Sequence, residues 1–441
     1  MKITVKNFGT IAEADVHIGG LTVITGENDT GKSTIGKIVF SIVKAIARYE
    51  EDLEEDKEER VTAIVERLYF TLRRKVNIAV QTELRELFHP RKFYSQLRTE
   101  RIESIEERIN ILKRLEHAEE LSTLSFEAAR SELLKIKYIM DEPDDEISAI
   151  NRAIRKAFFS EFRGEIIQKG HVLPVKASLE INDGASQLID IKWTKDGIYQ
   201  FKYGDDLGYS DATYVDSPAI IQFHNLVRMA KTLFDNGEPG RLTVPLHLKD
   251  LAGKLSDSIY SYLIHVDLFS DQNDVNQSLD ISKKINSAFN GEMKYDIEKL
   301  DFLLERDGYA VSSSNTASGI KSLGILDLLV KGGNASDNSL LILDEPEVNL
   351  HPKWQVLYAE LICQLVKSGV DIIITTHSPY IIDALKFYSD KLTIKNHFYL
   401  ATKFPGEQYS TFMDISDNIS YAIDLLAAPL NIFSQEIIDD F

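Results

Sequence analysis

The sequence contains one cysteine and no long uninterrupted run of apolar residues. The single cysteine, Cys363, excludes an intrachain disulfide and a metal site built from several thiolates, and its apolar neighbourhood predicts an unreactive core thiol. No stretch approaches the ~20 apolar residues of a membrane span. Residues 1–8 alternate like a strand and lack the apolar run of a signal peptide. We therefore expect a cytoplasmic protein without a membrane partner.

The sequence has fewer basic than acidic residues: 50 Lys and Arg against 69 Asp and Glu, which gives a net charge of −19. This balance argues against a chain-wide electrostatic attraction to nucleic acid and confines any such contact to a local patch. One stretch combines basic and aromatic residues, but acidic residues interrupt it, which is more typical of a solvated helix. Its members are Arg91, Lys92, Phe93, Tyr94, Arg98, Arg101, Arg108, Lys113 and Arg114.

The 441 residues, 44% of them hydrophobic, suffice for two or three domains. Short β-rich runs up to residue 24 precede a helical segment from about 31 to 46, and a charge block at 50–60 marks a boundary. Helical periodicity follows and predicts a compact helical insertion over 50–170. Period-two alternation with turns at 182–184 and 196–197 then predicts an antiparallel meander of three strands, which belongs with helical sequence in a lobe over 171–290.

The C-terminal part begins with a predicted hairpin over 294–311, centred on Asp307-Gly308. The apolar runs 340–343 and 370–375, separated by a helix over 354–366, have the rhythm of a parallel sheet. Residues 1–49 and 291–441 therefore form one discontinuous α/β domain. The predicted fold class is α/β, with a mixed sheet and helices, a helical insertion and an antiparallel β meander.

Residues 26–34 match the phosphate-binding loop pattern and lie between a predicted strand and a predicted helix, as that motif requires. Its glycines allow backbone N–H groups to surround phosphates at a helix N-terminus, Lys32 adds positive charge, and the Ser33 hydroxyl can ligate Mg²⁺. The predicted ligand is a nucleoside triphosphate. The predicted binding residues are Gly26, Glu27, Asn28, Asp29, Thr30, Gly31, Lys32, Ser33 and Thr34.

An apolar strand ends in the adjacent carboxylates Asp344 and Glu345. Such a strand can deliver Asp344 to Mg²⁺ and place Glu345 to orient or deprotonate a water that attacks the γ-phosphate. The alternative is a strand followed by a helix N-terminus, where acidic residues favour the helix dipole.

Two further segments have features of a phosphate site. His377 follows another buried strand and can sense the γ-phosphate, whereas the alternative is a helix cap formed by Thr376 or Ser378. Ser318 and Gly319 open a predicted helix whose N–H groups can face an anion, and the alternative there is an ordinary serine-rich cap.

Along the chain the four motifs follow one another as the phosphate loop, Ser318-Gly319, Asp344-Glu345 and His377, and a long insertion separates the first two. This order resembles an ABC-type ATPase head of the RecF/SMC/OLD superfamily. The runs 344–352 and 376–379 resemble most closely the stand-alone ATPases of bacterial anti-phage defence systems and the OLD family proteins. The resemblance implies a homodimer that encloses two ATP molecules, in which Ser318 and Gly319 of one subunit face the γ-phosphate bound by the other.

The same resemblance assigns roles to single residues. Lys32 and Ser33 bind phosphate and Mg²⁺, Asp344 holds the metal, Glu345 is the general base and His377 is the switch. Residues 347–350 would form a loop that approaches the dimer interface. The family's signature segment has a leucine and a second glycine where this chain has Ala317 and Ile320. Because of these two departures, the sequence does not predict the rate of hydrolysis. The glutamine that usually touches Mg²⁺ is not obvious, and Gln222 is the candidate.

The sequence therefore predicts a Mg²⁺-dependent ATPase that acts as a dimeric switch on a separate effector protein or a nucleic-acid contact, in anti-phage defence or DNA repair. The alternative is an ATP-gated scaffold with little hydrolysis that regulates a separately encoded effector. A built-in nuclease is disfavoured because few residues follow His377 and no Asp-x-Asp cluster occurs among them. The long insertion disfavours the ATP-binding subunit of a transporter.

Overall fold

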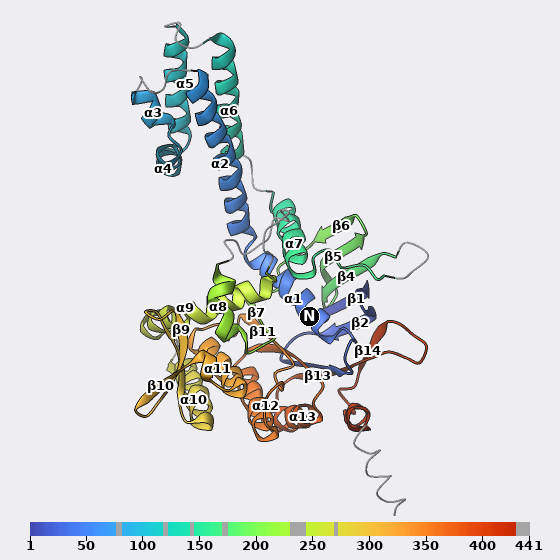
Figure 1. Ribbon diagram of the computed structural model, residues 1–441. Helices are drawn as coiled ribbons and strands as arrows, with labels where there is room; N and C mark the ends of the chain where they lie inside the picture. Colours follow the sequence, from blue (N-terminus) through green and yellow to red (C-terminus); the bar gives the residue numbers. More distant parts are fainter. Residues whose placement is uncertain are drawn as a thin grey trace, which may run out of the picture. The chain divides into compact units, whose positions relative to one another are not determined.

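The computed structural model describes residues 1–75, 82–117, 122–141, 145–169, 175–229, 244–268 and 272–428. The chain divides into two compact units, Met1–Ala47 with Asn151–Phe441, and Arg48–Ile150 (Figure 1). This division places residues 151–290 in the same unit as the two ends of the chain, whereas the sequence analysis treats 171–290 as a separate lobe.

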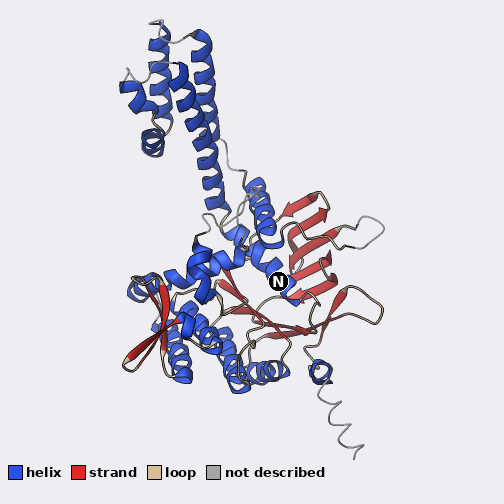
Figure 2. Cartoon of the chain, viewed as in Figure 1, coloured by secondary structure: helices blue, strands red, loops and turns tan. Residues whose placement is uncertain are grey.

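The first unit is built on a mixed sheet to which the described residues contribute eleven strands, in the order β6-β5-β4-β1-β2-β14-β13-β3-β12-β11-β7. Figure 2 shows the strands of the chain in red. The strands are β1 (Lys2–Phe8), β2 (Ile11–His17), β3 (Leu21–Gly26), β4 (Ala177–Asp183), β5 (Ser186–Thr194), β6 (Gly197–Tyr203), β7 (Asp211–Val215), β11 (Ser339–Asp344), β12 (Asp371–Thr376), β13 (Asn396–Thr402) and β14 (Ser410–Asp414).

The strands from β13 to β7 run parallel to one another. They are continuous apolar runs because helices cover both faces of this part of the sheet. Their register brings Leu343 beside Val215 and beside Ile374, so the carboxyl ends of β7, β11 and β12 lie at one edge. The phosphate-loop strand β3 pairs with β12 and ends at that same edge. Loops that follow parallel strands at a common edge are the usual place for a ligand site.

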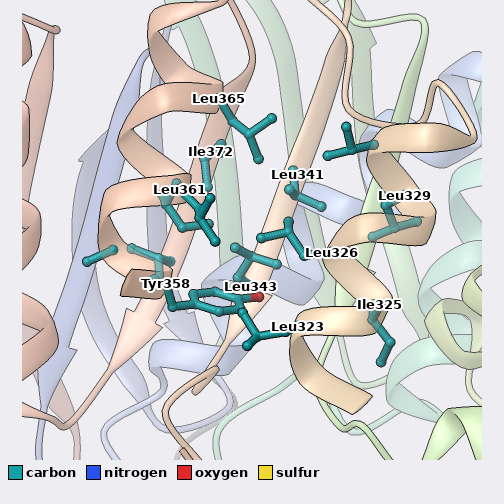
Figure 3. Close-up of a cluster of buried hydrophobic side chains, with 14 of the residues drawn as sticks. Leu323, Ile325, Leu326, Leu329, Leu341, Leu343, Tyr358, Leu361, Leu365 and Ile372 are labelled. Atoms are coloured by element: carbon teal, nitrogen blue, oxygen red, sulfur yellow. The ribbon is translucent and has the colours of Figure 1, made fainter. Parts of the chain in front are cut away.

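Successive side chains of β11 point to opposite faces of the sheet. On one face, α1 (Lys32–Ala47) approaches so closely that a Cβ at Gly36 would lie 3.0 Å from Ile342. On the other face, Leu341 and Leu343 belong to an apolar core that also contains residues of α11 (Ser318–Lys331), α12 (Pro352–Lys367) and α13 (Pro379–Leu392). Figure 3 shows side chains of α11, α12 and β12 meeting around these two leucines. Cys363 is fully buried in this core, and burial raises the pKa of its thiol to about 12.

The antiparallel half of the sheet contains the predicted meander, because β4, β5 and β6 pair in sequence order. It continues through β1, which pairs with both β4 and β2. Aromatic rings from β1, β5 and α7 (Glu146–Phe162) fill its core, and Phe8 lies 5.8 Å from Trp193 and 6.2 Å from Phe158 between ring centroids. This packing anchors the C-terminal part of α7 to the sheet.

A second, three-stranded sheet has the order β10-β9-β8. The predicted hairpin is confirmed, since β9 and β10 pair around Asp307-Gly308. The elements of this region are α8 (Ile220–Arg228), α9 (Leu246–Leu268), α10 (Gln272–Phe289), β8 (Glu292–Asp296), β9 (Asp301–Arg306), β10 (Tyr309–Ser312) and the 3₁₀ helix η1 (Ser313–Asn315).

The second unit is helical and has its own apolar core, which includes Leu68, Phe93, Ile105 and Leu133. Its helices are α2 (Tyr49–Lys75), α3 (Thr82–Phe88), α4 (Pro90–Glu100), α5 (Ile102–His117) and α6 (Thr123–Asp141). No helix in the described part of the chain is long and apolar enough to cross a membrane.

Arg108 and Phe93 do not belong to a surface patch. The Arg108 side chain is fully buried, donates to the carbonyl oxygens of Leu87 and Ser104, and lies 3.8 Å from the Phe93 ring centroid. Burial lowers the pKa of Arg108 to about 10. The sequence interpretation that includes these two residues in a basic, aromatic surface stretch is therefore wrong, because the guanidinium satisfies backbone carbonyls within the helical core.

Candidate nucleotide-binding site

The phosphate loop is held in a conformation that requires glycine at two positions. Gly26 has φ +143°, and a Cβ there would lie 2.1 Å from the carbonyl oxygen of Ala401. Gly31 has φ +80°, and a Cβ there would lie 2.6 Å from a side-chain carbon of Ile11. Both positions combine a positive φ with a close neighbour, so any side chain would strain the loop.

Side chains from both ends of the first unit anchor the loop. The Thr30 hydroxyl donates to the Glu27 carbonyl at 2.8 Å, and the Ser410 hydroxyl donates to the Thr30 carbonyl at 2.7 Å. Lys403 pairs with the Asp29 carboxylate at 2.6 Å. These contacts fix the loop, which leads directly into the N-terminus of α1, and a helix N-terminus favours an anion.

Lys32 lies over the loop rather than in solvent. Its ammonium donates to the carbonyl oxygens of Gly26 at 3.0 Å and Glu27 at 2.7 Å. Burial lowers the pKa of Lys32, and the opposing effect of nearby carboxylates, first Glu345 and then Asp344, does not fully offset it. A phosphate at this loop would supply the negative charge that the buried ammonium lacks.

Ser33 and Asp344 are brought together although they are distant in sequence. The Ser33 hydroxyl donates to Asp344 Oδ1 at 2.8 Å, and Thr375 bonds the same oxygen. The Tyr214 hydroxyl donates to the other carboxylate oxygen at 2.8 Å. A hydroxyl and a carboxylate are the oxygen ligands that Mg²⁺ prefers, so this pair fits the ion. A bound Mg²⁺ would neutralise charge on the phosphate oxygens.

Glu345 and His377 lie next to each other beyond the carboxyl ends of β11 and β12. Glu345 has φ +49°, and its backbone N–H donates to the Thr375 carbonyl at 3.0 Å. His377 Nδ1 lies 3.6 Å from Glu345 Oε1, close enough for electrostatic interaction but too far for a good hydrogen bond. Both side chains are partly exposed, so a phosphate or a water can reach them.

Glu347 has a role that the sequence analysis missed. Its carboxylate is buried and accepts hydrogen bonds from the Thr376 hydroxyl at 2.6 Å and from the His377 backbone N–H at 2.8 Å. It therefore holds the segment that carries His377. The resemblance places it in an interface loop, and within residues 347–350 the structure exposes Val348 and Asn349 instead. The sequence does show a further acidic residue directly after Pro346, which could have indicated a role for Glu347 in the site. The burial of its carboxylate could not be predicted from the sequence.

Ser318 and Gly319 begin α11, apart from the phosphate loop. Ser318 is exposed and Ala317, at the N-cap, offers no side-chain hydrogen bond, so the helix N-terminus is uncapped. A Cβ at Gly319 would lie 3.1 Å from Trp354, which explains the small residue there. No hydrogen bond within the described residues joins this pair to residues 26–34 of the same chain.

Gln222 does not lie at the metal site. Its amide donates to the carbonyl oxygens of Ser313 and Ser314 at 3.4 Å each, so the structure does not support it as the glutamine that touches Mg²⁺. Asp216 directly follows β7 and shares a cavity of about 20 Å³ with Asp344 and Glu345.

The strand that ends in the phosphate loop and the strand that ends in Asp344 flank β12, which leads to His377. This arrangement defines an ABC-type P-loop ATPase head, and it confirms the fold class predicted from the motifs. The chain belongs to the AAA ATPase domain family, whose model matches residues 1–382. Family membership supports ATP binding and hydrolysis.

Solved structures similar to this chain include heads of SMC proteins. An SMC head bound to the C-winged helix domain of ScpA is 11% identical with a TM-score of 0.43, covering 95% of this chain and 98% of that one. The SMC head from Thermotoga maritima is 12% identical with a TM-score of 0.36, covering 94% and 98%. The head with a coiled coil and joint from Pyrococcus yayanosii is 12% identical with a TM-score of 0.35, covering 97% and 99%. No curated protein matches the chain.

Proposed function

We propose that the protein is a Mg²⁺-dependent ATPase whose two copies close around shared ATP and thereby switch a separate effector protein or a nucleic-acid contact. The observation that carries the proposal is the Ser33–Asp344 hydrogen bond of 2.8 Å, which joins the phosphate loop to the acidic strand end. The resemblance of residues 344–352 and 376–379 to defence ATPases favours a cytoplasmic role in anti-phage defence, with DNA repair as the related setting.

Each side chain then has one task at the bound nucleotide. Lys32 and the N-terminus of α1 bind the phosphates, and Ser33 and Asp344 hold the metal. Glu345 orients the attacking water and accepts its proton, and His377 contacts the γ-phosphate. The partly exposed positions of Glu345 and His377 are consistent with these roles.

The exposed start of α11 supports closure by a second copy. Ser318 and the uncapped N–H groups of this helix form an anion-favouring terminus that the chain's own phosphate loop does not engage. A second copy would present this terminus to the γ-phosphate and complete the site. The departures at Ala317 and Ile320 support the alternative function, an ATP-gated scaffold that closes but hydrolyses slowly and regulates a separate effector.

The Glu345→Gln variant tests the proposal because it removes the base and retains the side-chain shape. We expect ATP with Mg²⁺ to assemble this variant into a stable dimer, measured by mass photometry, while phosphate release is lost. The exposed Glu298 provides the matched control, and Glu298→Gln should behave as wild type.

The outcomes separate the two functions. Rapid phosphate release by the wild type supports the switch, whereas ATP-dependent assembly without wild-type turnover supports the scaffold. If ATP changes neither assembly nor turnover, both functions are rejected.

A further inference from the structure

A buried ion cluster lies beside the nucleotide site and has no part in the proposed function so far. His247, at the start of α9, has a side chain that is only 2% exposed. Its Nδ1 lies 2.7 Å from a carboxylate oxygen of Glu161 on α7, and its Nε2 lies 3.1 Å from a carboxylate oxygen of Asp216. One imidazole therefore joins α7, α9 and the segment after β7.

The contacts of His247 determine its charge. Because each ring nitrogen faces a carboxylate, both nitrogens donate and the ring is an imidazolium. Burial alone would lower the pKa of His247, but the hydrogen bonds to Asp216 and Glu161 outweigh burial and raise it. Lys37 of α1 lies 3.3 Å from Glu161, so two cations balance two anions. The removal of one member would leave a buried charge without its partner, so the geometry of the cluster is strongly determined.

The cluster contacts the metal-binding carboxylate through Tyr214. The Tyr214 and His247 rings lie 5.0 Å apart between centroids, and Tyr214 is fully buried. Its hydroxyl donates to Asp344 Oδ2 at 2.8 Å, whereas the other oxygen of Asp344 accepts from Ser33 and Thr375. The orientation of Tyr214 therefore determines whether the second oxygen of Asp344 is held.

Asp216 provides a second connection. Strands β7 and β11 pair in parallel with Val215 beside Leu343, which places Asp216 and Asp344 next to each other at the strand ends. Both line the cavity of about 20 Å³, a volume close to that of a single water molecule. His247 holds one oxygen of Asp216, while the other is buried and has no hydrogen-bond partner in the described part of the chain.

We propose that His247 is a positioning residue of the nucleotide site, which holds Tyr214 and Asp216 and through them keeps Asp344 in the orientation that the metal requires. This inference rests on the proposed function, because it assigns a role to residues around its metal site. When a residue that orients a metal ligand is removed, metal affinity or activity commonly falls about 10- to 100-fold.

The test compares two buried histidines. His247→Gln removes the imidazolium, and His224→Gln is the matched control, because His224 is also buried but packs 4.7 Å from the Phe302 ring in another part of the unit. Mn²⁺ binding is measured by electron paramagnetic resonance with a non-hydrolysable ATP analogue bound. We expect His247→Gln to weaken Mn²⁺ binding about tenfold and to leave nucleotide affinity in EDTA unchanged. His224→Gln should change neither.

If His247 had a purely structural role, His247→Gln would lower the melting temperature without changing the Mn²⁺ affinity. That result would overturn the proposal. If His247→Gln does not fold, Tyr214→Phe decides the question, because it removes only the hydroxyl that reaches Asp344. Wild-type Mn²⁺ affinity in Tyr214→Phe would also overturn the proposal.

The wild type separates this inference from the proposed function. If the wild-type protein binds no nucleotide, both are rejected. If the wild type binds nucleotide and the variants keep its Mn²⁺ affinity, only this inference is rejected.

Discussion

Glu347 accepts a hydrogen bond from the backbone N–H of His377 at 2.8 Å, so a carboxylate on the β11 side of the site fixes the loop that follows β12. The same oxygen accepts the Thr376 hydroxyl. The candidate switch residue is therefore held by its backbone, while its partly exposed imidazole lies 3.6 Å from Glu345 and 3.5 Å from Glu347 through Nδ1.

The first prediction concerns this contact. Glu347→Gln replaces a charged acceptor by a neutral one, a difference of about 1 kcal/mol, so it should lower kcat by roughly fivefold. ATP affinity should change less than kcat, because the hydrogen bonds of Glu347 go to Thr376 and His377 and it acts on Lys32 only through its charge. Phosphate release and fluorescent-nucleotide binding measure the two effects.

Glu360 is the matched control for that prediction. It lies on α12 and pairs at its surface with Lys284, so Glu360→Gln should leave kcat unchanged. Equal turnover in Glu347→Gln and wild type would show that the position of His377 does not limit hydrolysis.

The second prediction concerns the phosphate loop. Gly26→Ala places a Cβ 2.1 Å from the Ala401 carbonyl oxygen at a φ of +143°, and we expect it to destabilise the protein by about 3 kcal/mol or more. Gly184 also has a positive φ, +56°, but a Cβ added there would meet no atom within 4 Å, so Gly184→Ala should cost only about 1–2 kcal/mol. Urea unfolding compares the two variants, and equal losses would refute the role of the close contact.

The third prediction concerns the helical unit. Arg108→Ala removes the side-chain donors to the Leu87 and Ser104 carbonyl groups, and the opening free energy of this unit should fall by about 1–3 kcal/mol. Arg114→Ala, at an exposed position of the same helix, should cost less than about 0.5 kcal/mol. Native-state hydrogen exchange of α4 and α5 measures both, and similar protection in the two variants would contradict the structural role of Arg108.

The fourth prediction concerns pH. The pKa of His247 is raised above 6.5, so its contribution to stability is complete below pH 6.5 and is lost as the pH rises through the folded value. Burial raises the pKa of Glu161 and of Asp216, but their contacts with His247 outweigh burial and lower the pKa of Glu161 below 4.5 and that of Asp216 below 3.8. The stability that these two carboxylates contribute is therefore lost as the pH falls.

The stability difference between wild type and His247→Gln should therefore be largest between about pH 4.5 and 6.5, and should shrink at alkaline pH. Melting temperatures of the two proteins across pH 4 to 9 measure this difference, with His224→Gln as the reference. A difference that stays constant with pH would show that the ring of His247 is not charged in the folded protein.

The parts of the site that could be predicted from the sequence are continuous segments. Residues 26–34 determine a strand, a loop and a helix start by local conformation alone, because Gly26 and Gly31 adopt backbone angles that other residues avoid. The strand that ends at Asp344 was equally predictable, since a short apolar run followed by charged residues has few other interpretations. The meander and the hairpin followed from period-two alternation and glycine turns.

Periodicity could not show that Arg108 is buried. It stands on a helix among acidic residues, where the charge pattern indicates a solvated face. Its burial depends on the carbonyl of Leu87 and the ring of Phe93, which only the packing of α3, α4 and α5 places around it. The partners of Gln222 could not be read from the sequence for a similar reason, because its amide donates to carbonyl oxygens of η1.

The sequence by itself determined the motifs from which the chemistry is proposed: a phosphate loop, an acidic strand end whose residue types fit a metal, and the fold class that these imply. The tertiary structure alone decided which distant groups support that chemistry. Tyr214, Asp216, His247 and Glu161 meet because β7 lies beside β11 and because α7 and α9 pack near the ends of these strands. Local motifs depend on the conformation of neighbouring residues, whereas strand order and helix packing depend on how the whole chain buries its apolar surface.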